Sequence, residues 1–439
     1  MERAGLECAV RPPLFYGWIV VAVAFVTMGL GVNARTAFSL LYPPILGEFG
    51  WERGVTAGVF SFGFFLSALL SPLFGRMMDS HGPRTVTLIG IGAIAAGLVL
   101  AGSWSREPWH FYLTLGALVG AGSVCLGYSC QALFLPAWFL RRRGLAMSIA
   151  FAGVGVGSIV LLPLMQSLID RFGWRAACIA LGVFALVLLT PLALLLRRRP
   201  EDIGLQPDGQ TDTDGAAAAA RRAYVVDHSW VAVEWTLGRA MRTGRFWWLA
   251  LGYFLGLFSW YLVQVHQTKY LVEVGFSASD AAWALGWVSF VGVPGQIALG
   301  QLSDRVGREI VWTIGSFGFL LTYCALLLLP GMPTVPLLVF MVVAQGLLGY
   351  GVTSVFGAIP AEIFEGKHYG SIFGMLMLVS ISGGAVGPWV AGVIHDRTGS
   401  YAWAFWIAIA ASVVSVLAIW RAAPRRVRAV AGKVAEAAP

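Results

Sequence analysis

The sequence predicts an all-α integral membrane protein with twelve transmembrane helices in two parallel six-helix repeats. Of its 439 residues, 58% are hydrophobic and only 12% are charged, whereas soluble domains carry about 25% charged residues. Twelve apolar runs are long enough to cross a bilayer core, which takes about 20 residues per helix. A polar loop in the first half of the chain also recurs in the second half.

The twelve runs alternate with short polar loops. The first run is too long for a secretory signal and has no small-residue cleavage site after it, so we expect it to remain as a span. The runs cover residues 15–41, 54–75, 85–104, 110–137, 145–168, 174–196, 246–268, 282–303, 310–330, 334–360, 370–393 and 402–420.

The net charge of +8 and the pI of 9.4 are explained by membrane topology rather than by nucleic-acid binding. If both termini are cytoplasmic, most of the 30 Lys and Arg residues fall in inner loops, for example at 141–143 and 197–199. This is the positive-inside bias. The 27 arginines against 3 lysines, with many Ala and Gly residues, favour a bacterial inner membrane. The five cysteines have neither disulfide nor metal-ligand spacing, and we expect no metal, no cofactor and no enzymatic centre.

Two segments of the chain are repeated at a nearly constant offset. "GRMMDSHGPRTV" follows the second run and "GQLSDRVGREIV" follows the eighth, so that Asp79 and Asp304 correspond at an offset of 225. "LIDRFGW" after the fifth run and "VIHDRTGS" after the eleventh correspond at an offset of 226. We therefore expect an N-terminal half (1–196), a cytoplasmic linker (197–244), a C-terminal half (245–421) and a cytoplasmic tail (422–439). Such repeats place the substrate between the halves, near the bilayer midplane.

The repeated loops resemble the Gly-x-x-x-Asp-x-x-Gly-x-Arg motif of the major facilitator superfamily. The second copy is one residue shorter before its arginine. In that superfamily the loop carboxylate and arginines form inner-side contacts that hold the outward-facing state. The resemblance assigns this latch role to Asp79, Arg84, Asp304, Arg305 and Arg308, together with Arg142 and Arg143 after the fourth run. The alternative is that these are ordinary solvated topology charges.

A second resemblance is narrower. "WFLRRRGLAMSIAFAG" (138–153) resembles the fifth-span signature of the monocarboxylate porter family, and "YGW" (16–18) its first-span Gly-Trp pair. The stretch "VHQTKYLVEVGFSASDAA" is similar to connections in bacterial members and in oxalate/formate antiporter relatives. The resemblance implies a transporter of small carboxylates.

The chain departs from those families in its C-terminal half. Animal monocarboxylate porters carry an aspartate–arginine pair in the eighth span, but "WALGWVSFVGVPGQIALGQ" has no charge. Oxalate antiporters hold a cation in the eleventh span, and "IFGMLMLVSISGGAVGPWV" has none. The charges that those families hold in the eighth and eleventh spans are therefore missing here, and the resemblance alone does not assign the substrate site or the coupling mechanism.

Arg35 is the only charged residue between Phe15 and Tyr42. A charge in the membrane is costly and usually faces a cavity or a partner. None of the 22 carboxylates lies deep in a span, and Glu362 is the nearest to doing so. In a wet cavity Arg35 could therefore bind a substrate carboxylate through two N–H groups. It lies about 30 Å along the helix from Phe15, and the alternative is that it extends to the outer headgroups.

His266 is a candidate for proton coupling, because histidine titrates near neutral pH. The alternative is a hydrogen-bonded packing residue. Tyr261 and Gln264 share a helix face, whereas His266 lies about 200° round the helix from Gln264. Both cannot face a cavity unless the helix is broken. The same two-residue spacing separates Asn33 from Arg35.

Further polar candidates lie in the fourth and tenth runs, which line the cavity in this superfamily with the first and seventh. Each has the alternative role of an interhelical hydrogen bond. The candidate substrate-binding residues are Arg35, Asn33, Tyr128, Gln131, Tyr261, Gln264, His266 and Tyr350, with Gln345 and Thr353 beside them.

These observations predict a secondary transporter that moves a small monocarboxylate by alternating access, as a proton symporter and as a monomer. Its partners would be the carboxylate, protons and the lipid bilayer. Anion exchange needs no titratable group and stays open. Export of an amphipathic solute is a further alternative, although cationic drug pumps generally need an intramembrane carboxylate. A neutral solute such as a sugar would leave Arg35 unused, and the short loops argue against a receptor.

Overall fold

The computed structural model describes residues 15–51, 53–209 and 222–437. Within them, ten continuous helical segments are long and apolar enough to cross a membrane. Two of these, Gly58–Ser103 and Arg143–Leu194, are long enough for two spans each and turn back at Gly82 and Gly173, where φ is +76° and +80°. The described chain therefore makes twelve crossings, as the sequence predicts.

The N-terminal bundle contains the first six crossings. Its helices are α1 (Tyr16–Thr36), α2 (Phe38–Phe49), α3 (Arg53–Ser103), α4 (Pro108–Phe111), a π-helical segment (Tyr112–Leu118), α5 (Val119–Leu126), α6 (Tyr128–Trp138) and α7 (Arg143–Leu194).

The C-terminal bundle contains the other six. Its helices are α11 (Gly244–Glu273), α12 (Ala278–Val306), α13 (Arg308–Leu328), α14 (Val335–Val343), a π-helical segment (Ala344–Gly349), α15 (Gly351–Phe356), α16 (Ala358–Phe364), α17 (Tyr369–Thr398) and α18 (Ala402–Ala422).

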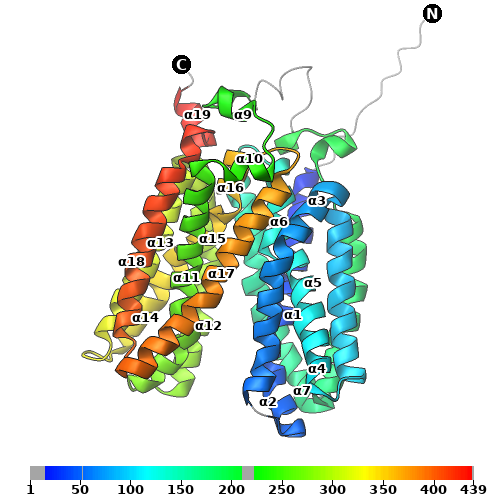
Figure 1. Cartoon of the computed structure of the whole chain (residues 1–439), viewed down its shortest axis with the longest axis vertical. Coiled ribbons are helices and arrows are strands. Elements are labelled where there is room, and N and C mark those ends of the chain that lie inside the picture. Colours follow the sequence, from blue (N-terminus) through cyan, green and yellow to red (C-terminus); the bar gives the residue numbers. More distant parts are fainter. Residues whose placement is uncertain (1–14, 52, 210–221, 438–439) are drawn as a thin grey trace, which may run out of the picture.

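Short elements of the linker and the tail gather at one end of the molecule, which we call the linker end (Figure 1). They are 3₁₀ turns at Pro200–Ile203, Pro207–Gly209 and Pro424–Arg426, and the helices α9 (His228–Val231), α10 (Leu237–Met241) and α19 (Ala431–Ala437). Linker and tail pair through Ala429, whose N–H donates to the Tyr224 carbonyl at 2.8 Å, and Val226, whose N–H donates to the Val427 carbonyl at 2.9 Å. The Ala, Asp and Gly content of the linker stretch 207–223 predicts a flexible segment, and most of this stretch lies outside the described residues. Helices α2 and α4 lie at the opposite, far end.

The first crossing is longer than its apolar run predicts. Helix α1 ends at Thr36, but α2 continues to Phe49, so the helical segment Tyr16–Phe49 spans 34 residues. Prolines at positions 43 and 44 lie within α2. Arg35 is therefore followed by about 21 Å of further helix and lies near the middle of this 34-residue segment.

The two bundles touch through α3 against α17 and through α7 against α12. In each of these two helix–helix contacts, a glycine of one bundle faces a glycine of the other. A Cβ added at Gly75 would collide with the carbonyl oxygen of Gly370, and one added at Gly144 with that of Gly300. Because membrane helices associate through close packing of small residues, these glycines let the bundles meet at the linker end.

We expect Gly300→Val to separate the bundles at the linker end, because the added side chain collides with Ser148 and Gly144. Spin labels on the exposed positions Arg142 and Arg305, one in each bundle, would then report a longer distance by double electron–electron resonance in a cysteine-free background. Gly286→Val is the matched control, since nothing lies within 4 Å of a Cβ at that position of α12. An unchanged distance in Gly300→Val would contradict the packing argument.

Candidate functional site

Asp304, at the end of α12, caps the first turn of α7 in the other bundle. Its carboxylate accepts hydrogen bonds from the backbone N–H groups of Gly144 and Leu145 at 2.9 and 3.1 Å. The first N–H groups of a helix have no hydrogen-bond partner within it, and the helix N-terminus carries a partial positive charge, so an anion is favoured in this place. One carboxylate thus joins the two bundles at the linker end.

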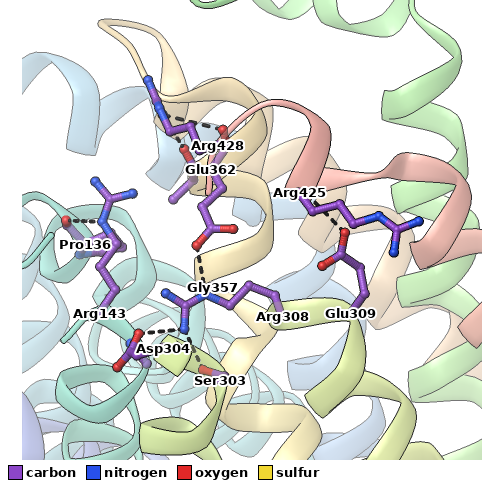
Figure 2. A network of polar contacts seen from close by, with 12 residues as sticks. Pro136, Arg143, Ser303, Asp304, Arg308, Glu309, Gly357, Glu362, Arg425 and Arg428 are labelled. Carbon is purple, nitrogen blue, oxygen red and sulfur yellow. Dashed lines mark hydrogen bonds and ion pairs between the residues drawn. The ribbon is translucent and has the colours of Figure 1, made fainter. Parts of the chain in front are cut away.

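Arg308 holds that carboxylate in position. It is 2% exposed, and donates to Asp304 at 2.7 Å, to the Ser303 hydroxyl at 2.5 Å and to Glu362 of α16 at 2.8 Å (Figure 2). Glu362 is itself buried. A buried arginine with two carboxylates and a hydroxyl meets the condition under which buried charges are tolerated.

Arg143 extends the network to the tail. Its Nε donates to the carbonyl oxygens of Pro136 and Phe139 at 3.0 and 2.8 Å, and its Nη2 donates to Glu365 at 3.1 Å. Arg428 of the tail donates to the same Glu365 oxygen at 2.6 Å. Glu365 therefore links the N-terminal bundle, the C-terminal bundle and the tail.

Asp79 of the N-terminal bundle caps a helix of the C-terminal bundle, as Asp304 caps α7 in the N-terminal bundle. It accepts from the N–H groups of Gly370 and Ser371 at the start of α17, at 2.7 and 2.8 Å, and from the Ser371 hydroxyl at 3.1 Å. Arg84, the counterpart of Arg308, is exposed, as are Arg142 and Arg305. The two contacts are therefore unequal, since only Asp304 has a buried arginine behind it.

Arg35 of α1 lies in a different part of the molecule, between the bundles. The ring of Phe64 from α3 covers its guanidinium, with 4.3 Å from Cζ to the ring centroid. Among the described residues, no hydrogen bond or ion pair reaches this guanidinium, and its N–H groups have no carboxylate partner. An arginine with free donors inside a membrane-spanning bundle is available to an anion.

Two tyrosines, Tyr128 and Tyr261, lie near Arg35, and Tyr350 lies near both of them. Tyr128 begins α6 just after a break at Gly127, Tyr261 lies in α11, and Tyr350 follows the π-helical segment of the tenth crossing. Tyr128 and Tyr261 face the guanidinium, whereas Tyr350 faces these two tyrosines and its hydroxyl is hydrogen-bonded to Ser289. All four side chains are half-buried. The first, fourth, seventh and tenth crossings thus each contribute one polar group to this central cluster.

Gln264 adjoins the central cluster on α11. It lies one turn from Tyr261, is half-buried, and accepts a hydrogen bond from the indole of Trp260. The Trp260 ring in turn meets Tyr350 at 5.2 Å between centroids.

Other predicted residues are occupied by packing contacts. Asn33 donates to the carbonyls of Gly29 and Val154 at 2.7 and 2.9 Å and accepts from Ser158 at 2.7 Å, which ties α1 to α7. Gln131 is fully buried and donates to Thr27 at 3.2 Å.

Gln345 is also engaged in packing, through an amide pair with Gln267 at 2.8 Å. The Thr353 hydroxyl donates to the Tyr350 carbonyl at 2.6 Å. None of these amides and hydroxyls joins the central cluster.

His266 lies on the side of α11 that faces α17 and α18. Its Nε2 lies 3.0 Å from the carbonyl oxygen of Pro388, and its Nδ1 3.2 Å from the Tyr401 hydroxyl. A carbonyl can only accept, so Nε2 donates and Nδ1 accepts from Tyr401. Since α11 is continuous over Gly244–Glu273, His266 and Gln264 point to different surroundings.

The sequence predicted the motif residues but not the side chains that contact them. Glu365 and Arg428 complete the linker-end network, and Phe64 covers Arg35. A signal existed for the acids, because Glu362 and Glu365 stand three apart at the end of an otherwise uncharged run. Phe64 belongs to the aromatic string "FSFGFF", in which no single ring is distinguished by the sequence.

Comparisons with known proteins show the family of this chain. The profile described as Major Facilitator Superfamily matches residues 18–353 and 249–438. The chain belongs to that superfamily. It is 30% identical over 406 residues to monocarboxylate transporter 11 of Mus musculus, covering 89% of this chain and 83% of the relative. It is 27% identical over 399 residues to monocarboxylate transporter 13 of Rattus norvegicus, covering 90% and 86%.

A solved structure supports the fold. The proton:xylose symporter XylE superposes with a TM-score of 0.70 at 14% identity, covering 92% of this chain and 95% of that one. The chain is therefore a multi-pass membrane transporter related to monocarboxylate transporters. These relatives are mammalian, and a bacterial origin stays a prediction.

We expect Glu362→Gln to lower the free energy of unfolding by about 1–3 kcal/mol, because Arg308 loses a charged hydrogen-bond partner in a buried place. Thermal unfolding of the purified protein in detergent measures this as a lower midpoint. Asp396→Asn is the control, because the Asp396 side chain is 83% exposed. Equal midpoints for the wild type and Glu362→Gln would mean that the buried pair contributes nothing to stability.

Proposed function

We propose that this transporter carries a small monocarboxylate across the membrane by alternating access, with Arg35 as the group that binds the carboxylate. The observation that carries the proposal is a guanidinium near the middle of its crossing that has no acidic partner among the described residues. Snorkelling to the headgroups is disfavoured, because about 21 Å of helix follows Arg35. Tyr128, Tyr261 and Tyr350 would supply further donors around the substrate.

The linker end would be the cytoplasmic side, since the arginine-rich loops lie there and positive loops stay inside. The contacts of Asp79 and Asp304 with opposite helix N-termini would then close the inner side and hold an outward-facing state. Arg308 and Arg143 act in this latch through Glu362 and Glu365. Arg84, Arg142 and Arg305 would act only as topology charges, because their side chains are exposed.

Proton symport by the protein as a monomer is the coupling we propose first, with the substrate acid itself carrying the proton. The relation to monocarboxylate transporters supports the substrate class. Anion exchange is the second candidate, and a specific observation favours it. Both ring nitrogens of His266 are engaged with Pro388 and Tyr401, which leaves this histidine outside the central cluster.

We expect Arg35→Gln to reduce uptake of a labelled monocarboxylate into proteoliposomes by at least about tenfold, since truncating one side of a charged pair in a desolvated site costs about 2 kcal/mol or more. Arg106→Gln, at an exposed arginine of the far end, should transport like the wild type. Equal uptake by Arg35→Gln and the wild type would remove Arg35 from the site.

The same vesicles separate the two coupling modes. Symport predicts accumulation driven by an inward proton gradient without internal acid, and His266→Gln should retain it. Exchange predicts uptake only when the vesicles are preloaded with unlabelled acid. Loss of gradient-driven uptake in His266→Gln, with normal folding, would place the histidine back in the coupling mechanism.

A further inference from the structure

The surroundings of Arg35 define more of the substrate than its carboxylate. Phe64 covers one face of the guanidinium at 4.3 Å, while the N–H donors point outward in the plane of the group. A carboxylate pairs with a guanidinium in that plane through two parallel hydrogen bonds. An acid bound in this way would extend its body alongside the Phe64 ring.

Phe64 is part of a continuous row of aromatic rings. On the N-terminal side it meets Phe60 at 5.4 Å between centroids, and Phe60 stacks on Phe38 at 6.0 Å. On the C-terminal side Phe64 meets Tyr261 edge to face at 6.1 Å.

The row continues into the C-terminal bundle through Trp260, whose ring lies 6.3 Å from that of Tyr261 and 5.2 Å from that of Tyr350. Among the described residues, Phe64 with Tyr261 is the one ring pair that joins the two bundles.

Resting on the proposed function, we propose that the transported anion is an aromatic monocarboxylate. Its carboxylate pairs with Arg35 and its ring packs against Phe64 and Tyr261. The half-buried position of both rings leaves part of each surface open to a ligand. A ligand ring whose centroid lies about 4.5–7 Å from the centroids of Phe64 and Tyr261 would gain affinity beyond the area that it buries.

The contact between Phe64 and Tyr261 also lies between the two bundles, so the residues that select the body of the acid come from both. Phe64 covers Arg35 in the N-terminal bundle, and Tyr261 belongs to the C-terminal bundle. A flat substrate packed against both rings would therefore contact both bundles at once. A short aliphatic acid reaches Arg35 but has no ring to pack against Phe64 and Tyr261. We therefore expect Phe64 to determine the preference for the body of the acid, and Arg35 to determine the requirement for its charge.

Calorimetric titration of the purified transporter tests this with benzoate, cyclohexanecarboxylate and benzamide. Benzoate should bind roughly 3- to 10-fold more tightly than cyclohexanecarboxylate, which has a ring of the same size without a π-system. Benzamide, which has the ring without the charge, should not bind detectably. Phe64→Leu should abolish the preference for benzoate, and Phe64→Tyr should keep it. Phe65→Leu is the matched control, because Phe65 is 66% exposed.

The outcomes separate this inference from the proposed function. Equal affinity for benzoate and cyclohexanecarboxylate, with both lost in Arg35→Gln, would overturn the aromatic preference and leave monocarboxylate transport standing. A preference that survives in Phe64→Leu would also overturn it. Absence of binding for both acids, together with absence of uptake of any monocarboxylate, would overturn both.

Discussion

The free-energy cost of burying a charge organises this transporter. Arg308 is buried between Asp304, Ser303 and Glu362, and Arg143 is buried against Glu365 and two carbonyl groups. Arg35, by contrast, has an aromatic ring over its face and no acidic partner among the described residues. The paired arginines lie at the contact between the bundles, and we propose that the unpaired one binds the substrate.

In the proposed mechanism, the linker end and the central cluster have different roles. The linker end holds the bundles together through carboxylates that cap helices of the opposite bundle, over glycine pairs that permit close approach. The central cluster takes one polar side chain from each of four crossings, two in each bundle. Opening the linker end would move those pairs of crossings apart. A substrate that contacts both bundles can therefore bias the equilibrium between the two states, since a ligand shifts it only through differential contacts.

The sequence predicted the twelve crossings and the repeated motif loops, because hydropathy and a constant offset report both directly. The motif aspartates are visible in the sequence, but their partners are backbone N–H groups of Gly144 and Gly370 in the opposite bundle, which no side-chain pattern announces. The length of helix after Arg35 was underestimated because the apolar run ends near Tyr42, whereas the helix continues through two prolines to Phe49.

The polar candidates could be sorted only by their partners in space. Asn33 and Gln131 resemble Tyr128 and Gln264 in sequence, as polar residues in cavity-lining crossings, yet the first two are buried in contacts within one bundle. His266 and Gln264 were separable by helical geometry, but which of them faces the centre depends on the packing of α11 against α17 and α18.

The most direct test of the central claim is an experimental structure of the transporter with a bound monocarboxylate. We predict both carboxylate oxygens within about 3 Å of the Arg35 guanidinium nitrogens, between the two bundles. An acid bound elsewhere, with Arg35 extended toward the lipid headgroups, would contradict the account.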